Sequence, residues 1–481
     1  MKQLDWKIIY TKYDGVIKRA VHFLSKEAGA LIIREPNVYR IHVLPCEKEG
    51  CKVSKNAFFV GCYNDSKAIQ QYVKKEEVPE KGFLVKIIKN PNDEEGRFVI
   101  LTALSDLEVF YAAVSFMDDY IPLHAPAHGA NRMPDLVFDS PLEEYSYTEA
   151  SDNQTRCIFT WGHVINDYRL YIDNMARMKY NELIIWNNYL PLNINEVIDY
   201  AHSYGIKVIL GYTWGWLDGY GSKVKDISDA RLEELKNSII EEYERDYAST
   251  NCDGIYFQSF TESNSDVVGG RSIAEAVTLL VYMTANELYK KYPNLYLQFG
   301  LHATSVKNRL DVIEKVDPRI DIIWEDCGEF PHHYCCFVRS EELYKESLEF
   351  TKKILQLRGG KGVGILFKGV MMMDWNKFVY QSGPFILGEN SESIKAHDRQ
   401  IRANAWRVYS GEWIHHGDRA LEMIKFIKEN KLGEVTLGLA GTFDGGIYLP
   451  VALCGQMLRN CEEDYKDVLR RTTKRPSLSY D

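Results

Sequence analysis

Acidic side chains follow directly after short apolar segments of this chain, at positions suited to acid–base chemistry. Glu262 comes after the segment 254–258, and Glu325 and Asp326 come after the segment 320–324. Cleavage of a glycosidic bond needs a proton donor for the leaving oxygen and a second group that is anionic or activates water. We therefore predict Glu262 as the general acid and Glu325 and Asp326 as further catalytic carboxylates. The alternative for each of them is a helix cap or an ion pair with Lys or Arg.

Tryptophan gathers at the same segment ends. Indole faces pack on the apolar C–H face of a sugar ring, and the desolvation they cause raises the pKa of a nearby acid toward the proton-donor role. Six of the nine tryptophans lie at such ends, namely Trp161, Trp186, Trp214, Trp216, Trp324 and Trp375. We predict that substrate is bound by Trp161, His163, Trp186, Asn187, Trp214, Trp324, Asp374 and Trp375. Alternatively, some of the indoles only fill the end of a folded core.

Eight apolar segments alternate with amphipathic helical segments between about residues 157 and 441. Such a repeat predicts an α/β fold of the (β/α)₈ TIM-barrel type, in which the carboxyl ends of the strands carry the active site. The polar and aromatic clusters stand at those ends. The predicted strands are 157–161, 183–186, 208–214, 254–258, 295–299, 320–324, 363–367 and 435–439.

The 481 residues exceed what a barrel of ordinary size needs, so we expect an accessory domain. Strand-like and helical segments alternate in residues 1–125, which predicts a small α/β domain before the barrel. Residues 126–155 are rich in Pro, Asp, Ser and Glu without periodicity and are interpreted as a linker. The catalytic barrel is then expected over 156–450, followed by closing helices in 451–481.

Composition limits the partners of this chain. A net charge of −10 without long runs of one sign argues against nucleic acid, and the apolar run 276–283 is too short to span a membrane. The N-terminus carries no secretory apolar region, and the ten cysteines form no regular framework. We expect a cytoplasmic protein with reduced thiols that acts on a small carbohydrate or glycoside. The sequence is also compatible with a homo-oligomer.

The chain contains metal-ligand side chains but no regular cofactor motif. The cluster of Cys327, His332, His333, Cys335 and Cys336 has the side chains that zinc prefers, but its spacing matches no regular tetrahedral site. The chain has no phosphate-binding loop, no convincing dinucleotide fingerprint and no serine nucleophile elbow. We therefore expect neither a cofactor nor a metal.

Two segments resemble known glycoside hydrolases. Residues 98–113, which end in Tyr111-Ala-Ala, resemble the accessory domain that precedes the barrel in family 20 β-N-acetylhexosaminidases and family 67 α-glucuronidases. The segment from Cys252 to Glu262 resembles their fourth strand, which ends in the catalytic acid. This resemblance implies an exo-acting glycoside hydrolase, first of all a β-N-acetylhexosaminidase-like enzyme with Glu262 as the acid.

One position departs from the family 20 pattern. Those enzymes place an Asp directly before the acid to orient the 2-acetamido group of the substrate, whereas this chain has Thr261. Either another residue such as Glu325 or Asp326 orients that group, or the mechanism differs. An inverting α-glucuronidase-like enzyme or another exo-glycosidase therefore stays open, as does a carbohydrate-binding barrel without catalysis. A uronide substrate would need a cation, for which Lys368 is the strand-end candidate.

Overall fold

The structure, a computed structural model, divides into two compact units. The first unit comprises Met1–Asp152, His202–Gly205 and Lys466–Leu478, and the second comprises Asn153–Ala201, Ile206–Tyr465 and Ser479–Asp481. The residues that the structure describes are 5–33, 43–53, 55–129, 131–160, 165–187, 189–216, 224–302, 305–325, 329–333, 339–370, 384–432, 434–441 and 446–479.

The first unit is built on a six-stranded mixed sheet in the order β2-β1-β3-β5-β4-β8. Strands β1, β2, β3 and β5 run parallel, while β4 is antiparallel to both β5 and β8. The strands are β1 Trp6–Tyr10, β2 Cys46–Lys48, β3 Asn56–Cys62, β4 Gly82–Asn90, β5 Asp93–Ala103 and β8 Tyr145–Ala150. The short strands β6 Ala127–His128 and β7 Asn131–Arg132 pair only with each other.

Helices of the first unit cover both faces of its sheet. Helix α3 packs on β4 and β5 and is itself contacted by α1. Helix α2 contributes Ile69 to a buried cluster with Phe59, Leu84 and Phe98, which closes the other face. The helices are α1 Gly15–Ile33, α2 Lys67–Tyr72, α3 Asp106–Ser115, α4 Ile121–His124 and α15 Tyr465–Thr472.

Two segments are placed differently from the sequence expectation. Residues 145–150, expected in a linker, form β8, which pairs with β4. Its inward side chains are Tyr145, Tyr147 and Glu149 rather than aliphatic residues, so the alternation was hidden by polarity. Residues 466–478, expected among the helices that close the barrel, belong to the first unit. There the buried Arg475 donates from Nε to Asp119 Oδ1 at 3.1 Å.

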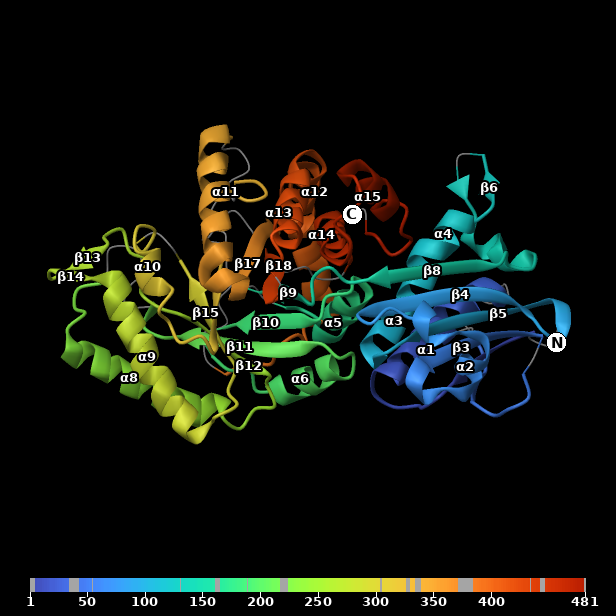
Figure 1. The fold of residues 1–481 in the computed structure, drawn as a ribbon, viewed down its shortest axis with the longest axis horizontal. Helices are drawn as coiled ribbons and strands as arrows, with labels where there is room; N and C mark the ends of the chain where they lie inside the picture. The colour runs from blue at the N-terminus through green and yellow to red at the C-terminus, as the bar shows by residue number, and fades with distance from the viewer. Residues whose placement is uncertain are drawn as a thin grey trace. The chain divides into compact units, whose positions relative to one another are not determined.

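The second unit is a closed barrel of eight parallel strands in the order β10-β11-β12-β15-β16-β17-β18-β9 (Figure 1). Strand β18 pairs with β9 and closes the circle. The predicted TIM-barrel class is confirmed. The strands are β9 Thr155–Phe159, β10 Glu182–Trp186, β11 Lys207–Thr213, β12 Gly254–Gln258, β15 Leu297–Leu301, β16 Ile320–Trp324, β17 Lys361–Val370 and β18 Glu434–Gly441.

Helices alternate with these strands, and side-chain caps fix several of their starts. Asp167, Ser228 and Ser340 each accept a hydrogen bond from a backbone N–H of the first turn, which satisfies one of its otherwise unpaired donors. The helices are α5 Tyr168–Arg177, α6 Ile194–His202, α8 Asp229–Glu242, α9 Ile273–Lys291, α10 Leu310–Ile313, α11 Glu341–Gln356, α12 Glu392–His416, α13 Asp418–Glu429 and α14 Leu449–Arg459. A hairpin of β13 Val267–Val268 and β14 Arg271–Ser272 precedes α9.

The structure bears on two sequence predictions, which concern membrane-spanning helices and the cysteines. None of the helices that the structure describes combines the length and apolarity needed to cross a bilayer. The cysteines in the described parts of the chain are all free thiols, and they are Cys46, Cys51, Cys62, Cys157, Cys252, Cys454 and Cys461.

The barrel interior is apolar in its middle and polar toward the strand starts. Phe159, Ile184, Ile209 and Ile323 are among the buried residues of the apolar layer. Toward the amino ends, Gln298 Nε2 donates to Glu182 Oε1 at 3.0 Å. Glu182 is only 2% exposed. Its burial raises its pKa from 4.5 to about 7, because the hydrogen bond from Gln298 and the charge of Lys207 offset only part of the desolvation.

This buried carboxyl gives a prediction for pH-dependent stability. The folded protein holds the Glu182 proton up to about pH 7, whereas the unfolded chain releases it near 4.5, so the free energy of unfolding falls between these values. In Glu182→Gln the amide keeps an acceptor for Gln298 but carries no titrating proton. We expect the variant to match the wild type below pH 4.5 and to exceed it by roughly 3 kcal/mol above pH 7. Urea unfolding across this range measures the difference, and a gap independent of pH would contradict the assignment.

Candidate active site

Glu262 lies just beyond the carboxyl end of β12 and is partly exposed. Its Oε2 accepts a hydrogen bond from the indole Nε1 of Trp216 at 2.8 Å. Trp216 follows β11, and its own backbone N–H donates to Thr213 Oγ1 at 2.8 Å. Between them Gly215 adopts a φ of +86°, a conformation that favours glycine. This tight turn therefore sets the indole against the carboxyl.

An aromatic chain links this acid to the barrel core. The ring of Trp216 meets that of Trp186 edge to face at a centroid distance of 6.3 Å, and Trp186 meets Tyr256 in the same way at 5.9 Å. Trp186 and Tyr256 are both buried in the apolar layer of the barrel. The indole of Trp186 lies over Gly211, where a Cβ would come within 2.6 Å of its Cε3. A missing side chain in β11 thus makes room for an indole from β10.

Glu325 directly follows β16 and is buried, with 1% of its surface exposed. Its Oε1 accepts hydrogen bonds from the hydroxyl of Tyr256 and from Nε2 of Gln258. Its Oε2 lies 3.1 Å from Nε2 of His302, the residue after β15. Burial alone raises the pKa of this carboxyl, but the charge of His302 and the hydrogen bonds from its three partners outweigh burial and lower it. Glu325 is therefore a fixed carboxylate anion.

The two carboxyls have different environments. Glu262 is reached by solvent, and among the described residues only Trp216 donates to it. Glu325 is enclosed, with two donors on Oε1 and the His302 ring nitrogen 3.1 Å from Oε2. The first is accessible from solvent. The second suits a permanent negative charge that holds His302 and Tyr256 in place.

The structure brings together only part of the predicted site. Trp186 joins Glu262 and Glu325 through the aromatic chain, and Asn187 follows it, partly buried, at the end of β10. The predicted residues Trp161, His163, Asp326, Asp374 and Trp375 lie outside the described residues.

Trp214 and Trp324 do not line the mouth of the barrel. Trp214 is fully buried and stacks on Phe257 at a centroid distance of 3.7 Å. Trp324 donates from Nε1 to Thr351 Oγ1 of α11 at 3.1 Å. Both indoles therefore belong to the packing outside the barrel wall, and the expectation that they bind substrate does not hold. The reason is strand parity, because the residue next to an inward-facing position points outward.

Sequence reasoning missed several residues of this site. Tyr256 and Gln258 were treated as part of an apolar strand, although both hydrogen-bond Glu325. The signal available was their spacing of two, which places two polar-tipped side chains on one face of β12. His302 is not among the predicted site residues, and Trp216 is predicted only as one of the strand-end indoles, without a partner. Gly300, on β15, carried no signal at all.

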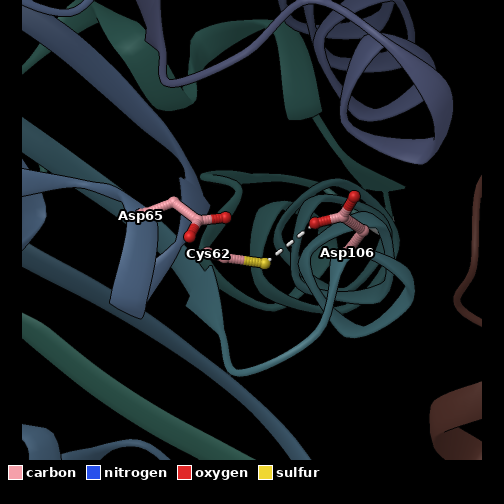
Figure 2. Close-up of side chains that lie close together, drawn as sticks. All are labelled: Cys62, Asp65 and Asp106. Carbon is pink, nitrogen blue, oxygen red and sulfur yellow. Dashed lines mark hydrogen bonds between the residues drawn. The ribbon is translucent and has the colours of Figure 1, made fainter.

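A separate group of ligand-type side chains lies in the first unit. Cys62, Asp65 and Asp106 approach one another at the ends of β3 and β5 (Figure 2). The thiol of Cys62 donates to Asp106 Oδ1 at 3.0 Å, and Lys12 pairs with Asp106 Oδ2 at 2.7 Å. Burial, reinforced by Asp106, raises the pKa of the thiol. A protonated thiol and an acid already neutralised by lysine make this group a poor metal site. Cys327, Cys335 and Cys336 lie outside the described residues.

Comparisons with known proteins give weak likenesses. No family model matches the chain, and no curated protein matches it. Among solved structures, the protein named CpGH84D is 13% identical with a TM-score of 0.47, over 85% of this chain and 65% of that protein, so this chain spans less than two thirds of it.

Two further structures are similar at the same level. A family 20 exo-β-N-acetylglucosaminidase from Vibrio harveyi is 11% identical with a TM-score of 0.48, over 98% of this chain and 73% of that one. A family 89 glycoside hydrolase from Clostridium perfringens is 9% identical with a TM-score of 0.43, over 84% and 48%. These identities and scores assign neither a family nor a reaction to this chain.

Gly300 offers a test of how tightly the Glu325 cluster is built. A Cβ at this position would overlap the phenol of Tyr256 and lie 2.8 Å from Glu325 Oε1. We expect Gly300→Ala to lower the free energy of unfolding by about 1–3 kcal/mol or more, because the buried cluster cannot yield. The matched control is Gly411→Ala on α12, where a Cβ meets nothing within 4 Å and alanine favours the helix. Equal urea midpoints for the two variants would show that the cluster can accommodate the added methyl group without loss of stability.

Proposed function

We propose that this protein is an exo-acting glycoside hydrolase in which Glu262 is the general acid. The observation that carries the proposal is the pair of unlike carboxyls at the carboxyl ends of the barrel strands. Glu262 is partly exposed and bonded to an indole, and Glu325 is buried and held as an anion. Glycosidic cleavage requires one group that gives a proton and negative charge that offsets the developing oxocarbenium ion.

The proposed reaction balances with these groups and a water molecule. Glu262 gives its proton to the glycosidic oxygen as the bond to the anomeric carbon breaks, and the leaving group departs as an alcohol. Either a water oxygen then bonds to the anomeric carbon directly, or a substrate acetamido oxygen bonds first and water displaces it, which breaks that bond and re-forms the acetamido group. In the completing hydrolysis Glu262 takes a proton back from water. Glu325 keeps its charge throughout and acts through His302, Tyr256 and its electric field.

For the sugar itself we propose an N-acetylhexosaminide first, on the basis of the sequence around Glu262. Thr261 does not take over the role of the missing Asp, because its hydroxyl carries no negative charge and its side chain is fully buried. Orientation of an acetamido group therefore falls to other residues of the mouth. Glu325 is a poor choice for that task, since its three donors already surround it.

A panel of chromogenic glycosides tests the proposal. We expect turnover of an N-acetylhexosaminide by the wild type, and a loss of roughly 10²–10⁴-fold in kcat/KM in Glu262→Gln, which cannot donate a proton. The control is Glu234→Gln on α8, an exposed carboxyl that pairs with Arg231 at 3.0 Å and should leave turnover unchanged.

Circular dichroism of each variant confirms that the fold is intact. If only a uronide is turned over, the proposed substrate changes to a uronide and the proposed reaction remains glycoside hydrolysis. Absence of turnover on every glycoside, or full activity of Glu262→Gln, would overturn the proposal.

A further inference from the structure

We propose that Trp216 is a positioning residue for the acid, which fixes the side of the Glu262 carboxyl that carries the proton. The inference rests on the proposed function and adds a role that indoles at a sugar site do not ordinarily have. It starts from one contact, the hydrogen bond of 2.8 Å from Trp216 Nε1 to Glu262 Oε2.

An indole N–H is a donor only. An oxygen that receives this hydrogen bond must act as an acceptor, so it cannot at the same time point a proton at the indole. In a protonated carboxyl the carbonyl oxygen is a stronger acceptor than the hydroxyl oxygen, so this hydrogen bond favours the state in which Oε2 is the carbonyl oxygen and Oε1 bears the hydrogen. None of the described residues donates to Oε1, and Glu262 is partly exposed. The proton is thus held on the oxygen that a bound glycoside can reach.

The donor is itself held firmly. The backbone N–H of Trp216 is bonded to Thr213 Oγ1, and a Cβ on the preceding Gly215 would lie 3.3 Å from Phe260. The ring packs edge to face on Trp186 and against the apolar core of the barrel. A partly buried indole with such support cannot follow a rotating carboxyl, so the carboxyl must adopt the orientation that the indole sets.

The rival role for Trp216 is that of a platform on which a sugar ring stacks. The two roles differ in how they depend on the leaving group. A leaving group that departs readily as an anion needs no proton, so loss of a correctly oriented acid affects it little. Loss of a stacking platform weakens binding of the sugar whatever the leaving group is. The comparison of two aglycones on the same sugar therefore separates them.

The kinetic test uses Trp216→Phe with a methyl glycoside and a dinitrophenyl glycoside of the sugar that the wild type hydrolyses. We expect kcat/KM to fall by roughly 10- to 100-fold for the methyl glycoside and by less than about threefold for the dinitrophenyl glycoside. In a Glu262→Ala background the same substitution should change neither rate further, because the group it acts through is gone. Equal losses for both aglycones, or a further loss in the Glu262→Ala background, would overturn the inference.

A spectroscopic test leaves Trp216 unaltered and needs no turnover. In protein labelled with ¹⁵N-tryptophan, the indole resonance absent from Trp216→Phe identifies Trp216. We expect this resonance to shift in Glu262→Ala, which removes the acceptor, and to stay in place in the control Glu234→Gln. An unshifted resonance in Glu262→Ala would overturn the inference even if glycosides are hydrolysed. A shifted resonance in a protein that hydrolyses no glycoside would retain the positioning contact and reject the proposed function.

Discussion

The candidate site depends on one constraint, which is that the charge of Glu325 must be compensated inside the barrel. An ionised carboxylate removed from water is costly unless hydrogen bonds and an opposite charge replace its hydration. Tyr256, Gln258 and His302 provide that replacement, and they come from two strands other than the one that carries Glu325. Gly300 leaves the space in which phenol and carboxylate meet. Three neighbouring strands must therefore hold one register for the charge to be tolerated.

The same constraint separates the two acids. Because the donors of the cluster are directed at Glu325, it remains an anion, and Glu262 is left with an indole on one oxygen and solvent near the other. The edge-to-face contacts of Trp216, Trp186 and Tyr256 connect the two carboxyls through packed rings. Glu182, at the opposite end of the strands, behaves in the opposite way. Its hydrogen bond and nearby charge do not offset the cost of burying its negative charge, so it holds its proton up to about pH 7. The surroundings of the two buried carboxyls thus lower the pKa of Glu325 and raise that of Glu182.

The barrel could be predicted because apolar segments and amphipathic helical segments alternate regularly in the sequence. Seven of the eight expected strands overlap the observed ones closely, and the expected strand 295–299 is observed as Leu297–Leu301. Strand β8 was missed because its inward residues are Tyr and Glu, so an alternating edge strand resembled a polar linker. The segment 466–478 was assigned to the wrong unit because the sequence of a helix does not show which of two hydrophobic cores the helix packs on. Amphipathic helices carry information about a buried face and none about the partner of that face.

The sequence by itself determined that eight buried strands alternate with helices and that acids and indoles stand at the strand ends, because burial and periodicity are local properties of a chain. Only the tertiary structure decided which of those side chains face the interior. Trp324 and Glu325 are adjacent, yet the indole binds Thr351 outside the wall while the carboxyl joins the cluster inside it. Trp214 stacks on Phe257 in the outer packing, whereas Trp216, two residues later, contacts Glu262 because the chain turns at Gly215 with positive φ. A shift of one residue exchanges the two faces of a strand, and the register is set by pairing with strands distant in sequence.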